Sequence, residues 1–206
     1  MKKPKLNFLI LRNNLFYCFL LIWATSGKGQ QSILANEGLH VIPYPKQAEL
    51  GAGDFMLVNG ISIILDENAG ESDRFTANEI VKYLKDEFKI KAQIKNIHAT
   101  GPAIILTQQG AKKMPSDEGY ELSVDKKQVI IRATTARGRF YGMQTLLQLS
   151  QLKNGKSFIK GVKIKDWPST PVRVIHYDTK HHQDTREYVE SFIRDLARYK
   201  ITVLVW

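Results

Sequence analysis

The stretch DEGYELSVDKKQVIIRATTARGRFYGMQTLLQL, residues 117–149, carries the clearest structural pattern of this 206-residue chain. Apolar and polar residues alternate on both sides of Lys126-Lys127, which predicts an antiparallel hairpin with one buried face. The apolar residues that follow have helical spacing and predict a helix that packs on that face. The residues we assign to the core are Tyr120, Leu122, Val124, Val129, Ile131, Ala133, Phe140, Met143, Leu146, Leu147 and either Leu149 or Ser150.

A second amphipathic helix is predicted upstream, over residues 71–89, with Ser72 or Asp73 capping its first turn. Its apolar side is formed by Phe75, Ile80, Val81, Leu84 and Phe88. Residues 55–65, FMLVNGISIIL, predict another hairpin, because Asn59-Gly60 separates two apolar runs. Further strands are expected in AQIKNI (92–97), PAIILTQ (102–108) and SFIKGVKIKDWPS (157–169). Together these elements predict an α+β domain over 31–166, a mostly antiparallel sheet with two helices on one face.

The last segment, RVIHYDTKHHQDTREYVESFIRDLARYKITVLVW (173–206), predicts strand, loop, helix and strand. A connection this long implies parallel strands joined by a right-handed crossover, a βαβ unit. Asp184 followed by Glu187 suggests a capping box at the start of the helix. Alternation places Val172, Val174, His176 and Asp178 on one side of the first strand and Arg173, Ile175 and Tyr177 on the other, and the buried stripe of the helix is expected at Val189, Phe192, Ile193 and Leu196.

Residues 1–30 have the pattern of a secretory signal peptide. Basic residues precede the apolar run LFYCFLLIWA (15–24), and TSGKGQ then supplies small and polar residues for cleavage. The alternative is a membrane anchor, but a run of ten residues is short for a span that needs about 20. We therefore expect export to the periplasm or outside the cell, with no membrane attachment after cleavage. Cys18, the single cysteine, would be removed with the signal, so no disulfide is expected.

The net charge of +10 falls to +5 when residues 1–30, with five basic and no acidic residues, are removed. The remaining basic residues are scattered singly along the chain. Nucleic-acid binding is therefore not expected, because it needs a concentrated basic surface.

A candidate site follows the first strand of the βαβ unit, at Asp178, Lys180, His181 and His182. Sites of parallel βα architectures lie at the carboxyl ends of the strands. A carboxylate beside basic groups can hold sugar hydroxyls or an anionic ligand. The adjacent histidines point in different directions and lack a third ligand, so no metal is expected. A polar loop with Asp178 in an ordinary salt bridge explains the same residues equally well.

Three stretches resemble glycoside hydrolase family 20, the β-N-acetylhexosaminidases. HVIPYPKQAEL (40–50) is similar to the family's opening IPxP strand, and 118–149 to the end of its non-catalytic N-terminal domain. KDWPSTPVRVIHYDTKHH (165–182) is similar to the start of its catalytic barrel, DxPxxxxRGxxxDxxRH. The resemblance implies that residues 167–206 begin a truncated (β/α)8 barrel on which the N-terminal domain packs.

The resemblance also implies a function, the removal of terminal N-acetylglucosamine or N-acetylgalactosamine from glycans with retention of configuration and without a cofactor. In this family the 2-acetamido group of the sugar attacks the anomeric carbon, an Asp orients it, and a neighbouring Glu protonates the leaving oxygen. That Asp-Glu pair follows the fourth barrel strand, whereas this chain stops at the second. We therefore expect no catalytic residue in this chain and no activity from it alone.

The motif DxxRH maps onto Asp178, Thr179, Lys180, His181 and His182, so its sugar-binding Arg falls on His181. The D-x-K form is similar to the hexosaminidase D-like branch of the family. Lys180 and His181 lack the two-pronged donor geometry of Arg, which leaves substrate preference open. Arg173 matches the Arg at the start of the barrel, and we interpret it as structural.

The alternatives are a family 84-like or α-glucuronidase-like glycosidase with the same accessory domain, or a non-catalytic glycan-binding domain. The exposed apolar strand at 201–206 argues against a stand-alone module.

Overall fold

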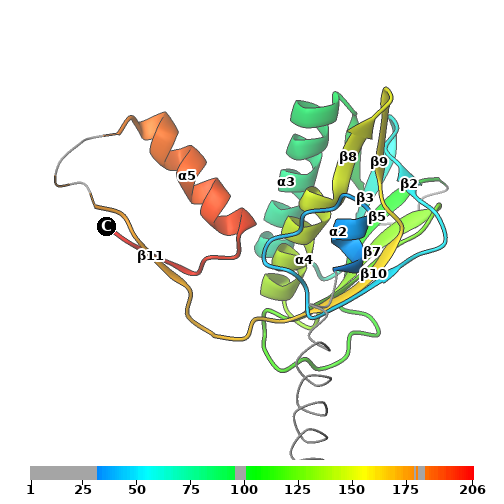
Figure 1. Cartoon of the computed structure of the whole chain (residues 1–206). Helices are drawn as coiled ribbons and strands as arrows, with labels where there is room; N and C mark the ends of the chain where they lie inside the picture. The colour runs from blue at the N-terminus through cyan, green and yellow to red at the C-terminus, as the bar shows by residue number, and fades with distance from the viewer. Residues whose placement is uncertain (1–31, 96–100, 179, 181–183) are drawn as a thin grey trace, which may run out of the picture. The chain divides into compact units, whose positions relative to one another are not determined.

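The computed structural model of the chain describes residues 32–95, 101–178, 180 and 184–206. Its main sheet has seven strands in the order β1-β10-β6-β7-β5-β3-β4 (Figure 1). The strands are β1 (Gln47–Leu50), β3 (Ile61–Leu65), β4 (Ala92–Lys95), β5 (Ala103–Thr107), β6 (Tyr120–Val124), β7 (Gln128–Arg132) and β10 (Val162–Asp166).

This sheet is mixed, so the prediction of a mostly antiparallel sheet is wrong. The neighbouring pairs β1-β10, β10-β6 and β6-β7 are antiparallel, whereas β7, β5, β3 and β4 run parallel to one another. For the pair β3-β4, the physical reason is the long helix between the two strands. A helical crossover returns the chain to the same end of the sheet, so the next strand runs in the same direction.

The predicted hairpin at 117–133 is confirmed as β6 and β7. Leu122 lies opposite Ile131 and Val124 opposite Val129, and all four side chains are buried. The carboxylate of Asp125 accepts hydrogen bonds from the backbone N–H groups of the turn and holds it closed. The alternation of the sequence therefore determines which face of the hairpin enters the core.

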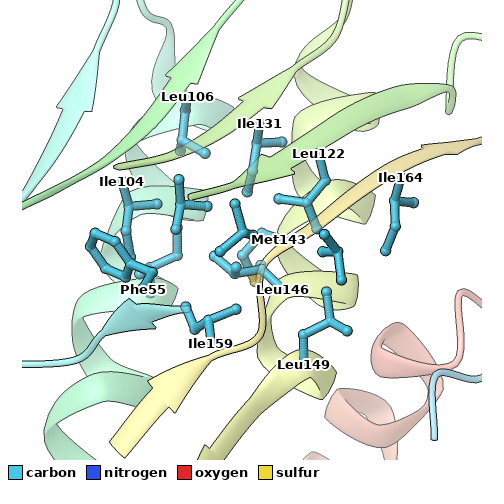
Figure 2. Packing of buried hydrophobic residues seen from close by; sticks show 14 of the residues in the cluster. Phe55, Ile104, Leu106, Leu122, Ile131, Met143, Leu146, Leu149, Ile159 and Ile164 are labelled. Carbon is cyan, nitrogen blue, oxygen red and sulfur yellow. The ribbon is translucent and has the colours of Figure 1, made fainter. Parts of the chain in front are cut away.

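The two long helices, α3 (Glu71–Phe88) and α4 (Ala136–Leu149), are also confirmed and lie side by side on the sheet (Figure 1). Met143, Leu146 and Leu149 of α4 point into the core between the helices and the strands (Figure 2). Glycine lets α4 approach closely, because a Cβ at Gly142 would lie 2.5 Å from Cγ2 of Ile131. A short helix, α2 (Ile33–Asn36), adds Leu34 to this core.

The start of α3 differs from the prediction. The cap residue is Gly70, and no side chain caps this end of the helix. Asp73 is buried instead and pairs with Arg139 of α4. Phe75, expected in the core, is 56% exposed and stacks against Phe140. Hydrophobicity alone could not show that a charged pair takes the inner position.

The predicted hairpin at 55–65 is wrong. Its first half, β2 (Phe55–Met56), pairs with β9 (Lys156–Ile159) in a separate three-stranded sheet, and β8 (Ser150–Lys153) completes that sheet. The tight Asn-Gly hairpin lies at Asn154-Gly155, between β8 and β9. Both residues have positive φ, 53° and 72°, as this turn requires. The single strand predicted at 157–169 is consequently two strands, β9 and β10.

The C-terminal βαβ unit consists of β11 (Val174–His176), α5 (Arg186–Arg198) and β12 (Val203–Val205), and its two strands are parallel as predicted. Exposure alternates along 172–178 as expected, with Val174 and His176 exposed and Ile175 and Tyr177 half-buried. No residue of α5 is fully buried, and Ile193, placed in the buried stripe, is 49% exposed.

The cap of α5 is Thr185, whose hydroxyl accepts from the N–H of Tyr188, so the capping box proposed at Asp184 is wrong. Thr185 occupies the position from which a side-chain oxygen can accept from the N–H three residues later, one of the free N–H groups of the first turn.

The predicted signal peptide lies outside the described residues. Among the residues that the structure describes, no helix has the length and hydrophobicity needed to span a bilayer.

Candidate functional site

The four predicted sugar-contact residues are only partly described by the structure. Asp178 lies two residues after the end of β11, and its Oδ1 accepts a hydrogen bond of 2.8 Å from the backbone N–H of Lys180. Both side chains are exposed, so a salt bridge buried around Asp178 does not fit. His181 and His182 lie outside the described residues. Within the described part of the chain, no cluster of three His, Cys, Asp or Glu side chains could hold a metal ion.

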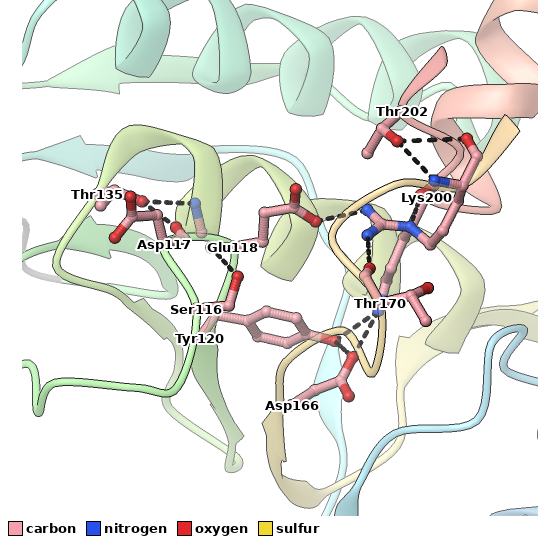
Figure 3. A network of polar contacts seen from close by, with 11 residues as sticks. Ser116, Asp117, Glu118, Tyr120, Thr135, Asp166, Thr170, Lys200 and Thr202 are labelled. Atoms are coloured by element: carbon pink, nitrogen blue, oxygen red, sulfur yellow. Dashed lines mark hydrogen bonds and ion pairs between the residues drawn. The ribbon is translucent and has the colours of Figure 1, made fainter. Parts of the chain in front are cut away.

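A buried polar cluster joins the C-terminal βαβ unit to the sheet domain, and its centre is Lys200 (Figure 3). The ammonium of Lys200, between α5 and β12, donates to Oδ2 of Asp166 at 2.8 Å and to the hydroxyl of Tyr120 at 2.9 Å. The Tyr120 hydroxyl donates to the same carboxylate and also contacts the hydroxyl of Thr145 on α4. Oδ1 of Asp166 accepts from the backbone N–H of Lys46. One side chain of the βαβ unit thus meets groups from β6 and β10, and Tyr120 extends this network to α4.

A second arm of the same junction is Arg173, immediately before β11. Its Nη2 pairs with Oε2 of Glu118 at 2.5 Å, and its Nη1 donates to the carbonyl of Thr170 at 2.8 Å. Its Nε donates to the carbonyl of Lys200 at 2.5 Å. The guanidinium also lies over the ring of Tyr141, 5.7 Å from the centroid. Arg173 is therefore structural in this chain, and it connects both strands of the βαβ unit to the loop before β6.

Burial dominates the electrostatics of this junction. It raises the pKa of Tyr120 well above its usual value, and the negative charge of Asp166 raises this pKa further. The pKa of Lys200 is lowered because loss of hydration outweighs the attraction of Asp166.

A cavity of about 200 Å³ borders the junction, with Tyr44, Trp167 and Pro168 along its wall. Four of its charged groups are engaged with one another, Glu118 with Arg173 and Asp166 with Lys200. Another, the ammonium of Lys46, donates to the hydroxyl of Ser169. The geometry therefore fits a joint between two parts of the chain better than a reaction centre.

Comparison with known proteins agrees with a boundary between the sheet domain and the βαβ unit. Residues 38–167 match the profile of glycosyl hydrolase family 20, domain 2. The chain belongs to glycosyl hydrolase family 20. The matched range covers the seven-stranded sheet and helices α3 and α4, and it ends at Trp167, before the βαβ unit begins.

Family 20 relatives are much longer than this chain. A beta-hexosaminidase of Porphyromonas gingivalis is 28% identical over 203 residues, which is 92% of this chain and 25% of that protein. A beta-hexosaminidase of Vibrio furnissii is 30% identical over 169 residues, 82% of this chain and 26% of that protein. The GH20 beta-N-acetylhexosaminidase from Streptomyces coelicolor A3(2) superposes with a TM-score of 0.70 at 27% identity, covering 80% of this chain and 33% of that one. The chain thus spans about a quarter of the length of these curated relatives.

The polar junction of the family 20 domain was missed at the sequence level, although a signal for it exists. In β10, Asp166 has the same parity as Val162 and Ile164, so a carboxylate at the end of this strand must face inward. Lys200 stands between the helix and an apolar strand, where a buried cation could have been suspected. Nothing in the local sequence shows that these two residues meet.

Proposed function

We propose that this chain is the N-terminal part of an exo-β-N-acetylhexosaminidase, and that residues 167–206 begin its (β/α)8 barrel. The observation that carries the proposal is the order of elements. The family 20 domain ends at residue 167, and a parallel βαβ unit follows at Val174–Val205. A (β/α)8 barrel is built by repeating such units, with about 250 residues in total. The greater length of the relatives leaves room for such a barrel.

In this proposal the substrate is a glycan with a terminal N-acetylhexosamine, and catalysis is substrate-assisted, with the acetamide of the sugar as nucleophile. The Asp that orients the acetamide and the Glu that protonates the leaving oxygen lie beyond this chain. Such a Glu must keep its proton near neutral pH, which requires a raised pKa. The contribution of this chain to the site is the loop of Asp178, Lys180, His181 and His182, which follows β11 and contacts sugar hydroxyls.

Supporting geometry comes from Asp178 at the carboxyl end of β11. Its carboxylate is exposed, and the bond to the Lys180 N–H fixes the direction of one oxygen while the other oxygen stays available. Sugar hydroxyls are commonly held by a carboxylate and a neighbouring cation. Lys180, two positions after Asp178, is similar to the D-x-K form of the hexosaminidase D-like branch, and His181 takes the place of the family Arg. Export through the segment 1–30 gives access to extracellular or periplasmic glycans.

The test compares this 206-residue chain with a longer product of the same reading frame. Release of 4-nitrophenol from 4-nitrophenyl N-acetyl-β-D-glucosaminide is expected from the longer product and not from the shorter one. In the longer product, Asp178→Asn should lower kcat/KM at least about tenfold, as expected for the loss of a hydrogen bond to a charged group. Lys163→Met, an exposed change on β10, is the matched control and should leave kcat/KM unchanged.

Two results would contradict the proposal. Hydrolysis by the 206-residue chain alone would show that its residues suffice for catalysis. A longer product that binds N-acetylglucosamine without cleaving the substrate would favour a glycan-binding role instead.

A further inference from the structure

The C-terminal βαβ unit has few means of holding itself together. Its sheet consists of two three-residue strands, and no residue of α5 is fully buried. A two-stranded sheet is marginal in water without packing against other elements. Among the described residues of this unit, the most buried is instead a charged one, Lys200, which is only 7% exposed.

We propose that Lys200 and Arg173 form a clamp that fixes the βαβ unit on the family 20 domain. The clamp consists of the Lys200 contacts to Asp166 and Tyr120 and the Arg173 contacts to Glu118 and the Lys200 carbonyl. The contacts of the two residues are connected, because Nε of Arg173 bonds the backbone carbonyl of Lys200 and the side chain of Lys200 enters the domain. The two residues are positioning residues, and neither is assigned a role in bond breaking.

The clamp acts at one end of the parallel strands. Arg173 immediately precedes β11, and Lys200 lies three residues before β12, so both hold the amino ends of the strands. The carbonyl of Arg173 also accepts from the N–H groups of Thr202 and Val203, which sets the register between the strands. Asp178 and Lys180 lie at the opposite, carboxyl end. The domain can therefore hold the βαβ unit firmly without touching the loop of the proposed sugar site.

A charged clamp specifies the placement more sharply than an apolar contact. Two buried ions lose hydration, and this loss is compensated only when geometry and hydrogen bonding are correct. Asp166 receives bonds from Tyr120 and the Lys46 N–H within the domain, so its cation is the contact that the βαβ unit supplies, through Lys200. A shifted unit would leave a buried carboxylate without its cation, which is strongly unfavourable.

The effect of the Lys200 side chain can be tested separately from the effect of its backbone conformation. Lys200 has φ 60°, a conformation that glycine adopts more easily, and the N–H of Ile201 closes the helix end on the carbonyl of Leu196. Lys89, directly after α3, has a similar conformation, with φ 59° and the N–H of Ile90 bonded to the carbonyl of Leu84. The Lys89 side chain is exposed, so this residue is a matched control.

The experiment is hydrogen–deuterium exchange of the full chain, comparing Lys200→Gly with Lys89→Gly. The clamp predicts that Lys200→Gly accelerates exchange in 173–177 and 186–205 at least about tenfold, the effect of losing a charge-assisted hydrogen bond, while β6 and β7 keep their protection. Lys89→Gly should leave both regions protected. Unchanged or slower exchange of the βαβ unit in Lys200→Gly would overturn the clamp, because it would show that the Lys200 side chain does not hold the unit in place.

Loss of Lys200 also leaves Asp166 buried without its cation, which could unfold the domain itself. The double variant Lys200→Gly with Asp166→Asn removes that charge and keeps a group that can bond Tyr120. It should expose the βαβ unit to exchange while β6 and β7 stay protected. Wild-type protection of 173–177 in the double variant would overturn the clamp. No substrate is used, so failure here would leave the proposed hydrolase function untouched.

Discussion

Arg139 and Asp73 form a two-pronged buried ion pair that joins helix α4 to helix α3. Nε of Arg139 lies 2.6 Å from Oδ1 of Asp73, and Nη2 lies 2.9 Å from Oδ2. Each side chain is only 8% exposed, and Nη1 of Arg139 also donates to the carbonyl of Ala133. The pair therefore connects both helices with the end of the β6–β7 hairpin inside the family 20 domain.

Removing one member of this pair should be costly. Arg139→Met leaves the Asp73 carboxylate buried without a cation, and we expect the free energy of unfolding to fall by about 3–5 kcal/mol. Replacing both, with Asp73→Leu added, should recover part of the loss because no charge then remains buried. Urea denaturation of the chain measures both changes. Arg186→Met, which breaks an exposed pair with Glu190, is the control and should cost less than about 1 kcal/mol. An equal loss of unfolding free energy in Arg139→Met and in Arg186→Met would contradict this account.

The turn at Asn154-Gly155 provides a test of backbone conformation. Gly155 has φ 72° and open space around it, so a side chain meets no steric neighbour and the penalty is purely conformational. We expect Gly155→Val to lower the free energy of unfolding by about 1–2 kcal/mol, because a β-branched residue is disfavoured at positive φ. Asn154→Gly should be tolerated. Thermal unfolding of both variants checks this, and a neutral Gly155→Val would refute the turn assignment.

The two Asn-Gly pairs show what the sequence could and could not decide about the fold. Asn59-Gly60 stands between apolar runs, whereas Asn154-Gly155 stands between Lys153 and Lys156, so the local signal favoured the wrong pair. Asn59-Gly60 connects β2 to β3 without forming a hairpin, because β3 pairs with β4 and β5. Asn59 accepts a hydrogen bond from the distant Lys91 N–H. Helices and the β6–β7 hairpin were predictable because their periodicity is local. Strand order and direction depend on pairings across long separations and were not.

Similar reasoning applies to the candidate site. The position of Asp178 at the end of β11 followed from the parallel βαβ pattern, which is local. The contact between Asp166 and Lys200 joins residues 34 positions apart, and that between Tyr120 and Lys200 spans 80. Such contacts depend on how a domain packs on the next segment. Parity predicts that Asp166 faces inward, but no sequence pattern names its partner.

Alkaline pH should weaken the fold through Tyr120. Burial and the charge of Asp166 raise its pKa in the folded state above the ordinary value of 10.0, so the unfolded chain loses this proton first. The stabilisation is complete below pH 10 and is lost as pH rises beyond it. Lys200 acts oppositely, since its folded pKa is lowered from 10.5 and its contribution grows as pH rises toward that value.

We therefore expect Tyr120→Phe to have a lower melting temperature than the wild type at pH 8, because its hydrogen bonds are lost, but a shallower decline above pH 10. Melting temperatures across this range measure the slope. Tyr44→Phe, at a tyrosine that is 47% exposed, should follow the wild-type slope. Parallel curves for the wild type and Tyr120→Phe would show that Tyr120 does not contribute to the alkaline loss.

The apolar strands of the βαβ unit should make the chain self-associate. Val174, Val203 and Val205 are 48%, 39% and 44% exposed, and Trp206 is 65% exposed. Within the described residues, β11 and β12 pair only with each other, so both have an open edge that can pair with another chain.

Sedimentation velocity of the 206-residue chain at rising concentration measures this association. Val205→Lys places a charge on the β12 edge and should shift the chain toward monomer. Val58→Lys adds the same charge at a residue that is 45% exposed and lies outside the strands, and it should leave the association unchanged. If both variants dissociate the chain equally, net charge is the cause rather than the strand edge. A wild-type chain that remains monomeric would show that the contacts already described suffice to protect these strands, and it would weaken the case for a missing neighbouring strand.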